Sequence, residues 1–551
     1  MNQNVQQLLY FKVIRDAAHG DLEFDKDEIE MINTREFQRL RHIRQLGLAY
    51  LVYPSASHSR FEHVLGVCHL AQKIIDVVNR ADPGRISDDD RKIIRYLALL
   101  HDVGHVPFGH TLEDERPVLD NKHDGHDRLN FFLHNTAIGE KLEKVETELG
   151  LQKLRNTLLT VLCATKKGGD PKSKKAVPKE KLYADIVGNT ICADLLDYLK
   201  RDALFTGIQH RYDDRIISNF RVTEESQLFI NLTDDRSART GLLSEILHLL
   251  RLRYTLGERV YYHRTKAAAS AMVSRAVELL GLKEQDLCDL GDDELLFILE
   301  NPVLLVSKFP RLKEGPVDDQ QAAARIASLL RKRALYEPVF RITRGDAEDK
   351  HKKNDLVSRY HSSKNRSIRQ KIETEMTEAC GLKPGQVIIY CPDGDMSLKE
   401  AEVQVRHSTG VDLEKLKDVT DRNVSEDINA LKEKHLALWS LEVLVDPDVL
   451  AQKGKQIASV FEGIHTNLNN DIAMYRGSGA GELAWEALVE AGKRSGLKDM
   501  STLQELMASA HKKGTSDLTT PEKWIEAYPD KLNPDLFSSS KPDEKKTKRP
   551  E

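Results

Sequence analysis

One short segment, LALLHDVGHVPFGHTLE, brings together several side chains that can bind a metal or transfer a proton: His101, Asp102, His105 and His110. The apolar run before them, IIRYLALL, predicts a buried helix that continues until it breaks at Pro107. Adjacent residues on a helix point about 100° apart, so His101 and Asp102 can converge on one point beside it. Imidazole and carboxylate together suit a borderline divalent cation, but two ligands alone do not hold one.

Two further polar residues lie in similarly apolar surroundings: His63 in SRFEHVLGVCHLAQ and Asp194 in NTICADLLDYLKRD. Burial of either without a partner costs on the order of several kcal/mol. Taken singly, each is compatible with a core residue whose polar atoms are satisfied by hydrogen bonds. The order H, HD, D on separate predicted helices instead favours one metal site that all four residues share.

These residues belong to a long region of helical character. From about residue 10 to residue 335, apolar residues recur at spacings of three and four. We therefore expect a mostly α protein in which residues 1–340 form a helical bundle. The β-rich runs QVIIYCPDG and LWSLEVLVDPD, bounded by Pro and Gly, predict a smaller α+β C-terminal lobe at residues 376–537, which follows a polar linker at residues 341–375.

Two stretches are too polar to pack into a core. Residues 165–181, TKKGGDPKSKKAVPKEK, predict a mobile Lys-rich loop, either a solvated excursion or a flap that contacts phosphate. Residues 538–551 are of low complexity, and we expect a disordered tail there.

The composition argues against several classes of protein. The 551 residues include 82 basic and 87 acidic ones, for a formal net charge of -5, so the chain as a whole does not attract nucleic acid or acidic membranes. No run of about 18 apolar residues indicates a membrane span. The six cysteines include no C-x-x-C pair, which argues against a thiolate zinc site and a disulfide framework. We expect a cytoplasmic protein that does not bind membranes.

Blocks of the sequence resemble the HD-domain deoxynucleoside triphosphate (dNTP) triphosphohydrolases, which are metal-dependent phosphohydrolases with a helical HD-domain bundle. The likeness covers roughly residues 10–335 and rests on FKVIRDAAHGDLEF, FQRLRHIRQLG, YPSASHSRFEHVLGV, LLHDVGHVPFGHTLE, KHDGHD, DYLKRDALFTGI and ERVYYHRTK. It extends to bacterial dGTPase-like proteins and is strongest to the branch with a sterile-alpha-motif domain before the HD domain. We expect no such extra domain here, because the matching blocks begin close to Met1.

The resemblance implies that hydrolysis releases deoxynucleoside and inorganic triphosphate, with magnesium bound by the triphosphate. It assigns one iron, manganese or zinc ion to four ligands: His63, His101, Asp102 and Asp194. His110, oriented by Glu113, matches the position that protonates the departing 5′ oxygen. His105 and His123, the latter followed by Asp124, match positions that contact the α-phosphate or assist proton transfer. Histidine suits these tasks because its pKa lies near working pH.

The same resemblance implies how a dNTP is held. Arg60 and Arg253 match phosphate-binding positions, where a guanidinium fork suits phosphate oxygens, and Tyr198 supplies a hydroxyl. The positions that hold the sugar 3′-hydroxyl correspond to Gln45 and Asp202. The positions that crowd C2′ and disfavour ribonucleotides correspond to Leu46 and Tyr261.

Two positions depart from the family pattern. Leu195 follows the last metal ligand, where the relative has a lysine that contacts the triphosphate, so the polyphosphate length is open. Asn33 replaces an aspartate that reads guanine in the relative's activating site, and a neutral amide cannot accept two guanine N–H bonds as a carboxylate does. Other residues still match the surroundings of that site: Lys12, Val13, Gln38, Arg41, Arg221 and Arg264. We expect a nucleotide-controlled homo-oligomer, a dimer or tetramer, with altered base preference.

Two other functions are compatible with the residues. Leu195 and the Lys-rich loop favour an HD-family nuclease or phosphodiesterase that acts on nucleic acid or on a nucleotide messenger. A nucleotide sensor without catalytic activity is the third hypothesis, and the presence of every metal ligand argues against it.

Overall fold

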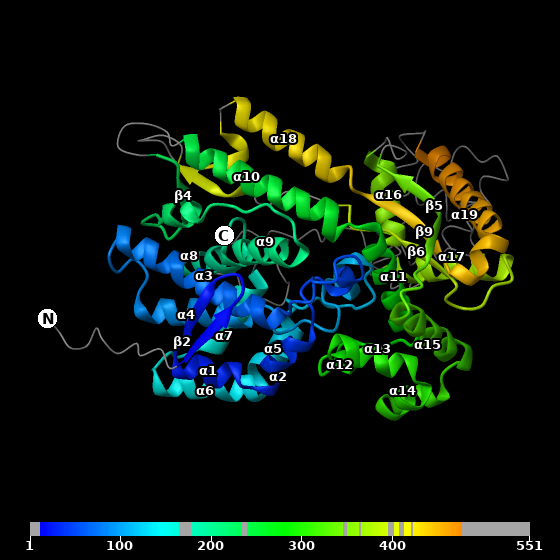
Figure 1. Cartoon of the computed structure of the whole chain (residues 1–551), viewed down its shortest axis with the longest axis horizontal. Coiled ribbons are helices and arrows are strands. Elements are labelled where there is room, and N and C mark those ends of the chain that lie inside the picture. The colour runs from blue at the N-terminus through cyan, green and yellow to red at the C-terminus, as the bar shows by residue number, and fades with distance from the viewer. Residues whose placement is uncertain are drawn as a thin grey trace, which may run out of the picture. The chain divides into compact units, whose positions relative to one another are not determined.

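A computed structural model describes residues 12–164, 178–233, 240–344, 350–362, 365–394, 402–406, 413–419 and 422–476 (Figure 1). Most of the predicted Lys-rich loop and the whole predicted tail lie outside the described residues. The chain divides into two compact units, Met1–Gly454 and Lys455–Glu551, and the first of them contains every predicted site residue.

Helices dominate the first two thirds of the chain. The first nine are α1 (Lys26–Ile32), α2 (Arg35–Gln38), α3 (Arg60–Ala81), α4 (Asp88–Leu100), α5 (His126–His134), α6 (Ala137–Glu148), α7 (Leu154–Ala164), α8 (Pro178–Gly188) and α9 (Ala193–Thr206). They are followed by α10 (Thr240–Leu256), α11 (Arg264–Leu279), α12 (Glu284–Leu287), α13 (Asp292–Glu300), α14 (Pro302–Lys308) and α15 (Val317–Arg331). Two single turns are π-helical: η4 (Thr111–Glu115) and η6 (Gly257–Tyr261).

Helices α3, α4 and α9 form the framework of the predicted site, because α3 packs against both of the others. Capping boxes start two of them, with Ser59 and Glu62 at α3 and Ser87 and Asp90 at α4. In each box a side chain satisfies a backbone N–H that the first helical turn leaves unpaired. Helix α9 ends at Gly207, whose left-handed φ of 72° stops the helix.

Helix α4 ends at Leu100, well before Pro107, so the predicted break point is wrong. Residues 101–104 form a turn instead. A Cβ at Gly104 would lie 2.2 Å from the carbonyl oxygen of His123, which shows how closely the two backbone segments approach. A tertiary contact, rather than the proline, accompanies the end of this helix.

Three small sheets complete the described part of the chain. Strands β1 (Lys12–Asp16) and β2 (Gly20–Phe24) form an antiparallel hairpin. A second sheet has the order β3-β4-β7-β8, with β4 and β7 parallel and the other pairs antiparallel. The third is antiparallel with the order β5-β9-β6. The strands are β3 (Phe220–Val222), β4 (Leu228–Asn231), β5 (Glu337–Thr343), β6 (Val387–Tyr390), β7 (Gln404–Arg406), β8 (Glu414–Lys415) and β9 (Ser440–Val445).

From residue 337 on, strands β5 to β9 alternate with helices, which confirms the predicted fold class: mostly α with a smaller α+β lobe. Its helices are α16 (Lys350–Tyr360), α17 (Arg366–Ala379), α18 (Arg422–Leu436) and α19 (Pro447–Arg476). The stretch expected as a polar linker, residues 341–375, therefore contains the end of β5, all of α16 and most of α17.

Apolar side chains gather in two buried clusters, one between α3, α4, α7, α8, α9 and α10, and the other between α11, α13 and α15. All six cysteines are free. Among the described helices, none combines the length and the apolar character that crossing a membrane requires.

Candidate active site

The four predicted metal ligands, called here the metal group, converge from three helices. Ligand atoms of His63, His101 and Asp194 lie within 4.8 Å of one another. His63 Nε2 is 3.0 Å from Asp194 Oδ1, and His101 Nε2 is 3.8 Å from the same oxygen. Asp102 Oδ1 is 3.6 Å from His101 Nε2. His63 comes from α3, His101 and Asp102 follow α4, and Asp194 belongs to the first turn of α9.

Both imidazoles of the metal group present Nε2 to the centre of the group. Nδ1 of His101 is 2.9 Å from the carbonyl oxygen of Ala98, and Nδ1 of His63 is 2.8 Å from Asp197 Oδ2. Nε2 of His101 is buried without a hydrogen-bond partner among the described residues. An orphaned buried nitrogen beside carboxylates fits a divalent cation that takes nitrogen and oxygen ligands.

Asp102 also faces cationic groups of the protein. Its Oδ2 accepts a hydrogen bond from Arg60 Nη1 at 2.6 Å, and its Oδ1 is 3.2 Å from His105 Nε2. Burial favours the neutral acid, but Arg60 and the neighbouring histidines hold the pKa of Asp102 well below its usual range. The carboxylate is therefore charged, and it connects the metal group to the histidines beyond it.

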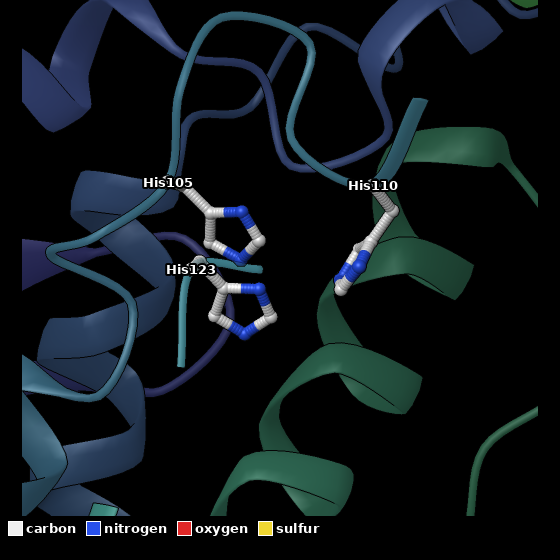
Figure 2. A group of neighbouring side chains, drawn as sticks. All are labelled: His105, His110 and His123. Carbon is white, nitrogen blue, oxygen red and sulfur yellow. The ribbon is translucent and has the colours of Figure 1, made fainter. Parts of the chain in front are cut away.

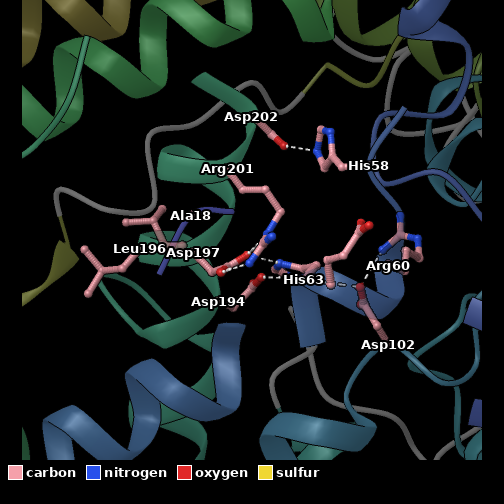
Figure 3. A network of polar contacts seen from close by, with 12 residues as sticks. Ala18, His58, Arg60, His63, Asp102, Asp194, Leu196, Asp197, Arg201 and Asp202 are labelled. Carbon is pink, nitrogen blue, oxygen red and sulfur yellow. Dashed lines mark hydrogen bonds and ion pairs between the residues drawn. The ribbon is translucent and has the colours of Figure 1, made fainter. Parts of the chain in front are cut away.

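Helix α9 carries a polar stripe that the sequence analysis recognised only in part. Asp194, Tyr198 and Asp202 were predicted site residues, but Asp197 and Arg201 lie on the same face at spacings of three and four. Asp197 Oδ2 accepts hydrogen bonds from His63 and Arg201, and both Asp197 and Arg201 are fully buried (Figure 3). The recurrence of charged residues inside an otherwise apolar helix was the signal that could have found them.

The charge of Asp197 fixes the orientation of His63. Burial would raise the pKa of Asp197, but Arg201, His19 and His63 hold it well below its usual range. An ionised carboxylate only accepts hydrogen bonds, so Nδ1 of His63 donates and Nε2 is turned toward Asp194. Burial would lower the pKa of His63, but Asp194 and Asp197 raise it to about 10, so a bound metal would take the place of the proton on Nε2.

His105, His110 and His123, called here the histidine group, lie together (Figure 2). The group is next to the metal group, because His105 Nε2 is 3.2 Å from Asp102 Oδ1. The ring of His105 stacks on that of His123, with centroids 3.7 Å apart. His110 meets both rings edge-on, at 4.9 Å and 5.3 Å. The side chain of His105 is fully buried, whereas that of His110 is 48% exposed. Burial and Arg60 lower the pKa of His105 well below its usual value, so this ring is neutral.

The carboxylate partners of these histidines differ from the prediction. Nδ1 of His110 is 2.7 Å from Asp114 Oδ2, whereas Glu113 Oε2 lies 2.9 Å from Nδ1 of His123. The other oxygen of Glu113 binds Arg128. The predicted pairing of His110 with Glu113 is therefore wrong, because in the π-helical turn the residue four positions on, not three, meets His110.

The segment that carries the histidine group has unusual backbone geometry. Phe108 and Gly109 have left-handed φ angles of 63° and 52°. Asp292 holds this stretch from outside, since its Oδ1 accepts from Phe108 N at 2.7 Å and its Oδ2 from Arg44 N at 2.9 Å. Burial raises the pKa of Asp292 to about 6. The position of the histidines thus depends on contacts with residues far along the chain.

A cavity of about 270 Å³ opens between the two groups. Most of the predicted catalytic and metal-binding residues line it, together with apolar side chains of α7 and α8. Among the predicted substrate contacts, Gln45, Arg60 and Tyr198 line the cavity. The Oε1 atom of Gln45 is buried and has no hydrogen-bond partner among the described residues, so an acceptor there is ready for a ligand donor.

The remaining predicted substrate residues do not line the cavity themselves. Asp202 is buried and accepts from Tyr261 Oη at 2.7 Å and from His58 Nε2 at 2.8 Å. The guanidinium of Arg253 lies over the Tyr261 ring, 5.1 Å from its centroid. His58, which the sequence analysis did not single out, also accepts the backbone N–H of Gln45 through its carbonyl.

Leu46 and Leu195 belong to the apolar core. Leu46 is 6% exposed and Leu195 is 3% exposed, so neither side chain is presented to solvent.

Comparison with known protein families accounts for this geometry. The model named HD domain matches residues 60–202, which hold the metal group, the histidine group and the polar stripe of α9. The chain is an HD-domain protein. A second model, HD associated region, matches residues 214–470.

Several curated relatives resemble this HD-domain protein. The deoxynucleoside triphosphate triphosphohydrolase SAMHD1 of Bos taurus is 33% identical over 285 residues, which are 48% of this chain and 47% of the bovine one. The SAMHD1 homolog of Dictyostelium discoideum is 29% identical over 342 residues, 60% of each chain. An uncharacterized protein of Methanocaldococcus jannaschii is 32% identical over 298 residues, 52% of this chain and 55% of that one. The chain thus spans about half the length of the curated relatives it matches.

A crystal structure of a hypothetical protein from Aquifex aeolicus shares the fold. Its TM-score is 0.54 at 22% identity, over 81% of this chain and 99% of that chain. At this identity the likeness concerns the fold alone.

The residues predicted to surround an activating nucleotide lie on separate elements of the HD-domain protein. Lys12 and Val13 are exposed on β1, and Asn33 caps the C-terminus of α1. Gln38 accepts a hydrogen bond from Arg41, whose guanidinium lies over the ring of Phe61.

Two arginines of the same predicted site belong to other parts of the fold. Arg221 on β3 donates to the carbonyls of Ser218 and Phe220, and Arg264 begins α11. A nucleotide site built from all of these residues stays a prediction.

Proposed function

We propose that this HD-domain protein is a metal-dependent phosphohydrolase that converts a dNTP to deoxynucleoside and inorganic triphosphate. One observation carries the proposal: the metal group, two members of the histidine group (His110 and His123) and Arg60 line the same cavity. Phosphoryl transfer to water requires a metal to activate the water, groups that transfer protons, and a cation that binds the phosphate. The Bos taurus and Dictyostelium relatives are named as deoxynucleoside triphosphate triphosphohydrolases, which supports the choice of substrate.

His63, His101, Asp102 and Asp194 would hold iron, manganese or zinc, with magnesium on the triphosphate. When bound, such a metal lowers the pKa of a coordinated water and neutralises charge on the phosphoryl group. Asp197 and the carbonyl of Ala98 keep the two imidazoles turned so that their Nε2 atoms face the ion.

The histidine group would handle protons and the α-phosphate. Asp114 holds Nδ1 of His110, so Nε2 of that ring can give a proton to the departing 5′ oxygen. Glu113 holds Nδ1 of His123 in the same way, and the neutral ring of His105 lies between His123 and Asp102. Asp124 lines the cavity beside them.

The sugar end would lie near Gln45, whose unpaired Oε1 can accept a hydrogen bond from the 3′-hydroxyl. Tyr198 also lines the cavity, and the contacts among Asp202, Tyr261 and Arg253 support this side of it. We propose that this side of the cavity leaves no room for a 2′-hydroxyl. Leu46, which is packed in the core, would contribute through the backbone position of Gln45.

We also propose a cytoplasmic homo-oligomer that binds a second nucleotide at Lys12, Val13, Asn33, Gln38, Arg41, Arg221 and Arg264. The free state of all six cysteines fits a reducing compartment. The placement of the predicted nucleotide residues on separate surface elements fits a site completed by another copy of the chain.

A product assay tests the proposed activity. The purified chain is incubated with Mn²⁺ and each dNTP in turn, with and without a second nucleotide, and the products are separated by anion-exchange chromatography. Inorganic triphosphate is expected, and the variant His101→Ala should release none. His210→Ala is the matched control, because His210 is an exposed histidine that does not line the cavity. Release of pyrophosphate from the dNTPs, or shortening of an oligonucleotide supplied in a parallel reaction, would instead support a different phosphohydrolase, such as the nuclease alternative.

A further inference from the structure

We propose that His19, in the turn between β1 and β2, is a positioning residue for the metal group. Through Asp197 it holds the imidazole of His63 with Nε2 toward the ion. The inference rests on the proposed metal site. It adds to that site a residue, His19, that lies more than forty residues before the first ligand, His63. It gives the N-terminal hairpin a function in the site.

Asp197 is held by four hydrogen bonds that saturate both of its oxygens. Oδ1 is 2.7 Å from His19 Nε2 and 2.9 Å from Arg201 Nη2. Oδ2 is 2.9 Å from Arg201 Nε and 2.8 Å from His63 Nδ1. A carboxylate with donors on every side cannot rotate without losing one of them, so His63 has a fixed acceptor.

The hairpin supplies two of the residues that hold this arrangement. Asp16 pairs with Arg201, with Oδ1 2.7 Å from Nη1. Oδ2 of Asp16 also accepts the backbone N–H groups of Ala18 and His19, at 2.8 Å and 2.9 Å. These contacts shape the turn so that His19 reaches Asp197. Together, Asp16, Arg201, Asp197 and His19 form a closed ring of contacts.

The arrangement excludes water. The side chains of His19, Asp197 and Arg201 are fully buried, and that of His63 is 1% exposed. Buried hydrogen bonds to a charged group are stronger than exposed ones, and loss of one donor leaves the carboxylate partly unsatisfied. Asp197 would then be free to turn, and His63 with it.

Metal affinity measured with Co²⁺ tests the inference without relying on catalysis. The metal-free full chain is titrated with Co²⁺ while visible absorption bands, which report ligand geometry, are recorded. His19→Leu should weaken Co²⁺ binding by roughly 10-fold, the lower end of the loss expected when the direct outer partner of a metal-binding histidine, here Asp197, is removed. It should also change the spectrum. His19→Gln places an amide donor where Nε2 was and should restore most of the affinity.

Arg15→Ala is the matched control, because Arg15 lies in the same hairpin but pairs with Asp21 on the surface. It should bind Co²⁺ as the unmodified chain does. Circular dichroism verifies that each variant folds. If His19→Leu does not fold, Asp197→Asn provides a second test of the same contact.

The outcomes separate the two proposals. If the unmodified chain binds Co²⁺ and His19→Leu binds it with the same affinity and spectrum, the role of His19 is overturned while the proposed function stands. If the unmodified chain binds no Co²⁺, the metal site itself is overturned, and the role of His19 with it.

Discussion

The metal group and two members of the histidine group, His110 and His123, line one cavity, but the two groups are held by different kinds of structure. Three residues of the metal group are on or directly beside α3, α4 and α9, and α3 packs against both of the other helices through an apolar core. The histidine group sits on an irregular segment between α4 and α5, with left-handed residues and a π-helical turn. The metal group depends on helix packing and on one buried network that reaches the N-terminal hairpin, whereas the histidine group depends on separate polar contacts with several elements.

This difference extends to what stands behind each group. Behind His63 lies the buried pair of Asp197 and Arg201, both from the neighbouring helix α9. The histidine segment is instead tied to distant elements: Arg39 donates to the carbonyls of residues 103 and 105, and Asp292 accepts from Phe108 N. Arg116, which follows η4, extends these contacts to Glu373 and the carbonyl of Ile389 in the C-terminal third, so the metal group should tolerate changes there better than the histidine group does.

Removal of a metal ligand should have the largest effect. We expect His101→Ala to lose more than about 100-fold in metal affinity, since even outer partners are worth 10- to 100-fold, and to release no measurable triphosphate. The measurement pairs Co²⁺ titration with the product assay. Retention of both properties by this variant would show that His101 binds no metal.

Removal of a histidine-group residue should separate rate from metal binding. His110→Ala takes away the proposed proton donor, which is worth roughly 10²- to 10⁴-fold in rate. Because His110 is not part of the metal group, Co²⁺ affinity should remain as in the unmodified chain. An equal loss of both properties would mean that the two groups are one unit, and the comparison would fail.

The same contrast explains which features of the site were predictable from the sequence. The metal group could be predicted because apolar periodicity places His63 and Asp194 on helices, and helix geometry sets where such residues point. The pairing of His110 with Asp114 could not, since it depends on a π-helical turn that the sequence does not distinguish from an α-helical one. The end of α4 was misplaced for a related reason: the approach of Gly104 to His123 is a tertiary contact.

The fold shows the same division. Helical periodicity predicted the mostly α character, and short β-rich runs predicted the lobe. The hairpin of β1 and β2 was missed, although GDLEF alternates in polarity, because it lies at the edge of a region of helical character. The parallel pairing of β4 with β7 joins residues 230 and 405, and no local pattern reports such a contact.

A buried network of charged residues connects the histidine segment to the C-terminal third of the chain, and its disruption tests how far the segment depends on that third. Arg116, which directly follows η4, donates to Glu373 of α17 at 2.9 Å and to the carbonyl of Ile389 at 3.1 Å. Glu373 also pairs with Arg275, at 3.1 Å. Glu373→Gln leaves buried arginines short of a counter-charge, and breaking such a pair costs about 3–5 kcal/mol.

We expect Glu373→Gln to lower the denaturant midpoint and the rate of triphosphate release while leaving Co²⁺ affinity close to normal. Glu375→Gln, an exposed position on the same helix, is the control and should change none of the three. A loss of metal affinity that matches the loss of rate would contradict the independence of the two groups.

The smallest of these effects is expected at Gly66, on the side of α3 that faces α9. A Cβ added there would lie 1.9 Å from Asp197 Oδ1 and 2.5 Å from Arg201 Nη2, so Gly66→Ala must displace the pair that holds His63. Overpacking of this kind typically costs about 1–3 kcal/mol. We expect a lower free energy of unfolding and weaker Co²⁺ binding. Gly241→Ala on α10, where an added Cβ meets nothing within 4 Å, should show neither change. Normal Co²⁺ affinity in a folded Gly66→Ala chain would show that His63 keeps its orientation without the exact placement of Asp197.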